Sequence, residues 1–87
     1  MAEQTKTEPT EQVKFQMPKT VENASLLCRT RMATLTALKT EFMNGRGPTQ
    51  DDLYAAANLY LEALRNYKKV KGVKLFIPSP TQVIASI

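Results

Sequence analysis

Residues 49–71 carry the strongest structural signal in the sequence, an amphipathic helix with recognisable ends. Thr49 is a favourable N-cap residue, and Asp52 stands where a capping box needs its acidic side chain. Three lysines precede Gly72 at the other end, where cations suit the helix dipole and glycine suits the stop. The apolar positions recur at steps of three and four: Leu53, Ala57, Tyr60, Leu64 and Tyr67. Such a helix needs a second apolar surface to cover this face.

A second amphipathic helix is predicted over residues 20–44, from Thr20 as the N-cap to a stop at Asn44. Its apolar stripe consists of Ala24, Cys28, Met32, Leu35, Leu38 and Phe42, with Leu27 and Met43 at the margins. Threonines along this segment lower its helix propensity, so the helix depends on packing. Only the Gly-Arg-Gly-Pro link at residues 45–48 separates the two helices. The sequence therefore predicts a mainly α fold in which residues 20–71 form an antiparallel αα-hairpin.

The hairpin is predicted to be flanked by an extended arm on its N-terminal side. Residues 1–11 are polar and lack apolar periodicity, so we expect a disordered tail. In residues 12–19, Val13, Phe15 and Met17 alternate with polar side chains before a proline, which is the pattern of a half-buried strand. An extended arm laid over a hydrophobic groove is the alternative interpretation of this segment.

Residues 72–87 are predicted to form an extended, apolar C-terminal arm with short β segments. Val73, Leu75 and Ile77 alternate with their neighbours, and a Pro-Ser-Pro sequence then forces an extended or turned backbone. A second alternating run follows from Val83 to Ile87. A β-hairpin and a single bent arm both fit this pattern.

The composition argues against most catalytic and metal sites. The 87 residues include no histidine and a single cysteine, Cys28. Within one chain this excludes Ser-His and Cys-His catalytic pairs, the usual zinc sites and an internal disulfide. Asp51 and Asp52 are explained by their place in the first turn of a helix, and Cys28 lies on an apolar stripe. We therefore expect a protein that is not an enzyme and that has no catalytic residues, no metal and no cofactor.

The sequence also gives an expectation for localisation. No apolar run approaches the ~18–20 residues that span a bilayer, and the N-terminal residues are polar. We therefore expect no membrane partner. The expected location is the cytoplasm, or a larger intracellular or viral assembly.

The apolar C-terminal arm is the predicted protein interface. Its candidate contact residues are Leu75, Phe76, Ile77, Val83, Ile84 and Ile87. A chain of 87 residues has a small core, and we do not expect one helical hairpin to cover so many large apolar side chains. Burial against a second copy or another protein, by strand addition or in a groove, is then the expected outcome.

A basic cluster at the end of the second helix is the candidate nucleic-acid contact. It consists of Arg65, Lys68, Lys69, Lys71 and Lys74, with Tyr67 among them. These residues could contact a phosphate backbone, with one aromatic ring for stacking. A solvated helix end whose cations complement the dipole explains the same residues and is the interpretation that we prefer. The net charge of +4 is mild and allows either interpretation.

Three functional hypotheses follow from the sequence. The favoured one is a non-enzymatic assembly or adaptor subunit that binds neighbouring chains through its helical face and C-terminal arm, for example in a multi-subunit structure such as a virion. The second hypothesis is a nucleic-acid-binding protein that uses the basic end of the second helix. The third and weakest is a protein inhibitor that covers an enzyme's surface.

Overall fold

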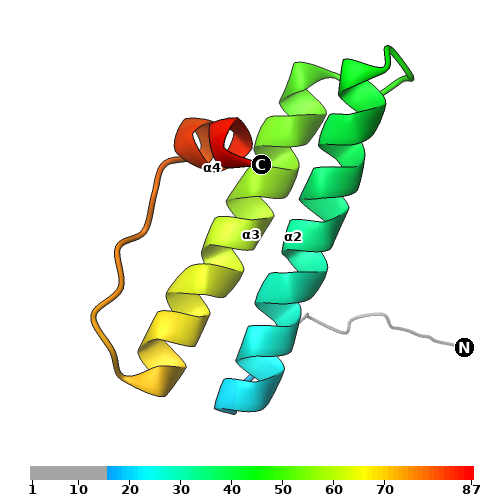
Figure 1. Ribbon diagram of the computed structural model, residues 1–87. Coiled ribbons are helices and arrows are strands. Elements are labelled where there is room, and N and C mark those ends of the chain that lie inside the picture. The colour runs from blue at the N-terminus through cyan, green and yellow to red at the C-terminus, as the bar shows by residue number, and fades with distance from the viewer. Residues whose placement is uncertain (1–15) are drawn as a thin grey trace, which may run out of the picture.

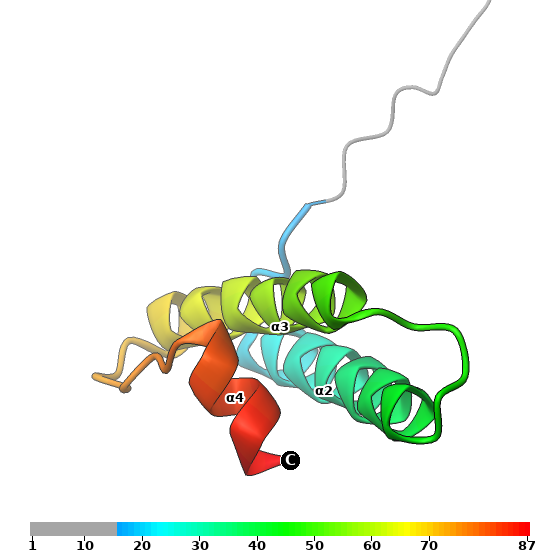
Figure 2. The same cartoon turned by 90° about the horizontal axis from the view of Figure 1, so that it is seen from above.

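The computed structural model describes residues 16–87, and this part of the chain is mainly helical (Figure 1). It contains α2 (Val21–Met43), α3 (Gln50–Lys71) and α4 (Pro80–Ser86). The two long helices lie side by side and are joined by a short turn, so they run antiparallel (Figures 1 and 2). The mainly α fold predicted from the sequence is confirmed. We call the end of this pair at residues 44–49 the turn end, and the opposite end the free end.

The ends of both long helices lie where the sequence placed them. The Thr20 hydroxyl accepts a hydrogen bond from the Asn23 N–H at 3.2 Å and caps α2. At the start of α3, the Thr49 hydroxyl accepts from the Asp52 N–H at 3.3 Å, and the Asp52 carboxylate accepts from the Thr49 N–H at 2.8 Å. Gly72 ends α3 in the left-handed region with φ +73°, a conformation that favours glycine. Local capping chemistry therefore defines the long helices.

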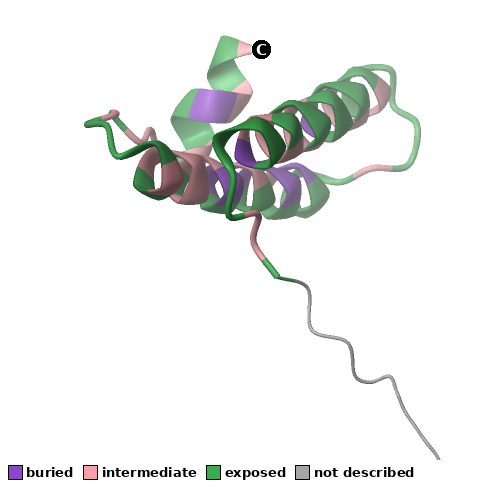
Figure 3. Ribbon diagram, turned by 90° about the horizontal axis from the view of Figure 1, so that it is seen from below, coloured by how far each residue is buried: buried purple, intermediate pink, exposed green. Residues whose placement is uncertain are grey.

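The core lies where the three helices meet and is small. Buried residues occur on each of the helices (Figure 3). They are Ala24 and Leu35 from α2, Leu53, Ala56, Ala57, Leu61 and Ala63 from α3, and Val83 from α4. Half of them are alanines, which let the helix axes approach closely while removing little apolar area from water per residue. Leu35 and Leu61 are the largest fully buried side chains among the described residues.

The prediction of β structure in the C-terminal arm is wrong for residues 80–86, which form α4. Ser79 is the N-cap, its N–H donating to Gln82 Oε1 at 2.8 Å while its hydroxyl accepts from the Gln82 N–H at 3.2 Å. Pro80 occupies the first helical turn, where a proline loses no hydrogen bond. The spacing of Val83 and Ile87 fits a helix as well as a strand, since residues four apart share a helix face. The Ser-Pro pair therefore begins a helix.

The rest of the two arms has no regular secondary structure where the structure describes it. Residues 73–79, which we call the strap, lead from the end of α3 back to α4 (Figure 1). Residues 16–19 lead into α2 without forming a strand. The predicted disordered tail at residues 1–11, and most of the predicted strand at Val13 and Phe15, lie outside the described residues.

A lysine from α2 holds α4 in place near the turn end. Lys39 Nζ donates to the carbonyl oxygens of Ile84 and Ile87, at 2.7 Å each. The last carbonyls of a helix have no partner within the helix, so a cation placed there satisfies them and complements the dipole. The Tyr54 hydroxyl lies 3.4 Å from that of Thr81 and adds a contact between α3 and the start of α4. These contacts fix α4 across one face of the hairpin (Figure 2).

Candidate functional site

The structure packs four of the six predicted interface residues against the protein's own core. Val83 is 3% exposed, and Ile77, Ile84 and Ile87 pack against the core cluster that contains it. The expectation that the hairpin could not cover these residues is therefore wrong for Val83, while Ile77, Ile84 and Ile87 are partly covered. A helix puts Val83, Ile84 and Ile87 on one side, and α4 has an apolar surface of α3 to pack on.

The strap carries the predicted interface residues that remain available. Phe76 is 75% exposed, the largest exposed fraction among the large apolar residues of the described chain. Leu75 is half-buried beside it. An exposed phenylalanine of this kind is costly in water and is a candidate contact residue.

The five basic residues predicted to contact nucleic acid surround the free end of α3. Arg65, Lys69, Lys71 and Lys74 are exposed, and Lys68 is half-buried. Lys71 Nζ donates to the Tyr67 hydroxyl at 3.1 Å and lies 5.5 Å from the centre of that ring. Lys71 is thus held by its own helix, and it covers the ring that was predicted to be available for stacking.

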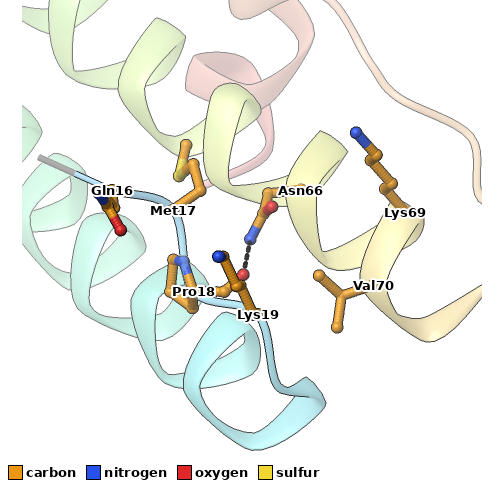
Figure 4. Close-up of a pocket in the computed structure, with 7 residues that line it drawn as sticks. All are labelled: Gln16, Met17, Pro18, Lys19, Asn66, Lys69 and Val70. Carbon is orange, nitrogen blue, oxygen red and sulfur yellow. Dashed lines mark hydrogen bonds between the residues drawn. The ribbon is translucent and has the colours of Figure 1, made fainter.

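A hollow beside this basic cluster joins it to the segment before α2 (Figure 4). This free-end hollow has a volume of about 560 Å³ and is lined by Gln16, Met17, Pro18, Lys19, Asn66, Lys69 and Val70. The Asn66 side-chain amide donates to the Pro18 carbonyl at 3.0 Å and fastens the segment to α3. Lys19 and Lys69 line the same hollow from different segments. Sequence reasoning missed Lys19 and Asn66, because their proximity arises only when residues 16–19 fold onto α3.

A second hollow lies on the face of the hairpin that also carries α4. This hairpin groove has a volume of about 360 Å³ and is lined by Cys28, Arg29, Met32, Ala33 and Tyr60. Met32 and Tyr60 also pack against the core cluster that contains Val83. The groove therefore continues the surface on which α4 lies, toward the free end. Its lining is mostly apolar, with Arg29 as its charged member.

The polar groups in the hairpin groove favour a role in contact over a role in chemistry. Burial raises the pKa of the Cys28 thiol, against the opposing effect of the Arg31 charge. Burial also raises the pKa of the Tyr60 hydroxyl, with a smaller contribution from Cys28. Both groups therefore stay protonated at neutral pH, and a protonated thiol is a poor nucleophile.

Another side of the hairpin is closed by an ion pair. Arg31 Nη1 donates to the Leu59 carbonyl at 2.8 Å and to Glu62 Oε1 at 3.1 Å, which links α2 to α3. Arg31 is 17% exposed and Glu62 is 57% exposed, so solvent screens only one side of the pair. Arg29 and Arg31 thus serve different surfaces, the first at the groove and the second between the helices.

Residues 16–87 also bear on metal binding and on membrane insertion. No group of three or more cysteine, aspartate or glutamate side chains there is arranged to hold a metal ion. Within the same residues, none of the helices combines the length and the apolar character needed to cross a membrane.

Comparison of the chain with models of known protein families, with curated proteins and with solved structures found no match.

Proposed function

We propose that this chain is a non-enzymatic assembly or adaptor subunit that binds a neighbouring protein chain, and that the hairpin groove is its main contact. The observation that supports this proposal is the incomplete cover of one apolar face. α4 packs over the part of that face nearest the turn end, while Met32 and Tyr60 continue it into an open groove. An apolar surface left open beside a packed one is typical of an interaction site.

The chain itself indicates what kind of segment fits this face. α4 is a short helix that places Val83, Ile84 and Ile87 on the hairpin. A partner segment of the same kind, a short amphipathic helix with aliphatic side chains, would extend the packed surface along the groove. Phe76 on the strap offers a second apolar contact, because it is exposed in the same chain.

A photo-crosslinking experiment tests the contact. A benzophenone amino acid replaces Arg29, an exposed residue of the groove. The full chain is expressed in its native cells, so that its natural partners are present. The matched control places it at Ala37, which is exposed on α2 and lines none of the described hollows. We expect a discrete crosslinked protein product from position 29 and none from position 37. Equal products from both positions, or none from position 29, would rule out the groove as the contact.

The free-end hollow supports a second candidate function, binding of a nucleic-acid backbone. Lys19 and Lys69 line one hollow, and Arg65, Lys68 and Lys74 belong to segments next to it. Cations gathered from separate segments suit the phosphate groups of a flexible strand. This candidate predicts that a fluorescent single-stranded oligonucleotide binds with an affinity that falls steeply as salt rises.

Two variants test whether the free-end hollow binds nucleic acid. Changing both Lys19 and Lys69 to Gln should weaken oligonucleotide binding, whereas Arg46→Gln at the turn end should leave it unchanged. If the parent protein does not bind at physiological salt, or if the three proteins bind alike, the candidate fails.

A further inference from the structure

We infer that the partner in the hairpin groove is a second copy of this chain, packed face to face and antiparallel, so that α4 of each copy covers the groove of the other. This inference rests on the proposed function and names its partner. It is argued from the shape of the face, from the symmetry that this shape permits, and from the distribution of charge.

The face that carries α4 is raised in one half and hollow in the other. α4 lies toward the turn end, where Lys39 and Tyr54 hold it (Figure 1). The hairpin groove opens nearer the free end, between Cys28 and Met32 of α2 and Tyr60 of α3. A raised element and a hollow therefore occupy different halves of one surface.

Twofold symmetry converts this shape into a self-complementary contact. When a second copy is turned about an axis that runs across the hairpin, its turn end lies over the free end of the first copy. α4 of each copy then meets the groove of the other, in one isologous interface that closes on itself. Turning the copy about the long axis instead would set α4 against α4 and leave both grooves empty.

The charges favour the same antiparallel arrangement. At the free end, residues 63–74 carry five cationic side chains and no acidic one. Near the turn end, Glu41, Asp51 and Asp52 outnumber Arg46 and Lys39. Antiparallel packing brings these unlike ends together, whereas parallel packing brings like charges together. Because such attraction is screened over about 8 Å at physiological salt, the dimer should weaken as salt rises.

The outward side of α4 is suited to close approach. Ala85 is exposed and small, and Thr81, Gln82 and Ser86, which are exposed with it, carry no charge. The outward side of α4 therefore brings no charged side chain to a contact with Met32 and Tyr60 of the groove. A second copy would also add to a core in which Leu35 and Leu61 are the largest fully buried side chains of the described residues.

Disulfide trapping tests this arrangement with the cysteine already present. In Ala85→Cys, the new thiol on α4 should meet Cys28 in the groove of the second copy. In the control, Ala37→Cys, an exposed alanine of α2 away from the groove is changed in the same way. Under mild oxidation at equal concentration, we expect Ala85→Cys to form a reducible dimer about tenfold faster or more, since the interface raises the effective concentration of its thiols. Circular dichroism of the reduced variants confirms that both are folded.

The possible outcomes separate the inference from the proposed function. Equal dimer formation by the two variants, or a disulfide formed only within the Ala85→Cys monomer, would overturn the antiparallel dimer. Light scattering on the unmodified chain should show a dimer that dissociates on dilution. The dimer should persist to lower protein concentration when less salt is present. If position 29 crosslinks to a different protein while no dimer forms, the adaptor function stands and the second copy is wrong. If no crosslink of any kind forms, both fail.

Discussion

The two halves of the hairpin are built from the same two helices, but their shared apolar face is covered in one half and open in the other. Toward the turn end, α4 covers the apolar face, and Lys39 fixes it with two hydrogen bonds at 2.7 Å. Toward the free end, the same face opens into the mostly apolar hairpin groove, and residues 63–74 carry five cationic side chains and no acidic one. Under the proposed function, the turn-end half supplies stability and the free-end half offers surface for binding.

The largest expected effect comes from the core of the covered half. Leu35 is fully buried in the cluster that includes Val83. Leu35→Ala should lower the free energy of unfolding by about 2–5 kcal/mol, because it removes buried methyl groups and leaves a cavity. Urea unfolding followed by circular dichroism measures this change.

Leu26→Ala is the matched control, since Leu26 lies on the same helix but is 53% exposed. Its effect should stay within about 0.5 kcal/mol. Similar losses from the two variants would contradict the assignment of the core.

Leu35 also illustrates what the sequence could predict. Its place on the α2 stripe follows from the spacing of apolar residues, and the helix ends at Thr20, Thr49 and Gly72 follow from capping chemistry. These signals are local, so they can be recognised without knowing the fold. Leu61 does not belong to the predicted α3 stripe, yet it is buried, because α3 packs against both α2 and α4.

The start of the C-terminal helix had a local signal in Ser79, Pro80 and Gln82, but the packing of this helix and the candidate sites depend on tertiary contacts that the sequence pattern did not reveal. The donor for the last carbonyls of α4 is Lys39, a residue of a different helix. The basic residues of α3 were identified, but the hollow that joins Lys69 to Lys19 forms only after residues 16–19 fold back. The hairpin groove exists because α4 is too short to cover the whole face.

The next largest loss of stability is expected at Lys39, and it should distinguish the turn-end half from the free-end half. Lys39→Met would leave the carbonyls of Ile84 and Ile87 without their donor. A hydrogen bond to a charged group contributes about 1.5–3 kcal/mol, so the loss should be in that range and should fall on α4. Hydrogen exchange should show faster exchange of the α4 amides while those of α3 change little.

Lys69→Met is the same substitution at the free end, where the side chain is exposed. It should change the stability by no more than about 0.5 kcal/mol. If Lys69→Met destabilises as much as Lys39→Met, the two halves do not differ as described.

A smaller effect is expected from the basic helix end. Lys68, Lys69 and Lys71 lie in the last turn of α3, and changing all three to Gln removes their interaction with the helix dipole. Each contributes about 0.3–1 kcal/mol at low ionic strength, and the loss should shrink as salt screens it. Thermal unfolding at two salt concentrations measures this, with Arg46→Gln as the control. Loss of tight oligonucleotide binding in the triple variant would promote the nucleic-acid candidate over the adaptor.

The smallest effect concerns pH and the hairpin groove. Burial raises the pKa of the Cys28 thiol above its ordinary value of 9.0, so the folded chain keeps this proton to higher pH than the unfolded chain. Stability from this group is therefore complete below pH 9 and is lost as pH rises beyond it. Thermal unfolding from pH 8 to 10 should show a smaller decline for Cys28→Ala than for the parent. Identical declines would mean that the thiol is not desolvated in the folded chain.

The position of Lys39 along the chain also has a kinetic consequence. The carbonyls that it binds lie 45 and 48 residues further on. Contacts between distant residues pay a larger loop-closure entropy and tend to form after local ones. During synthesis, Lys39 therefore emerges long before its acceptors exist, and the apolar face of the hairpin stays open until α4 has been made. Until then the growing chain exposes the whole of that face, and the turn-end half is closed only when α4 packs on it.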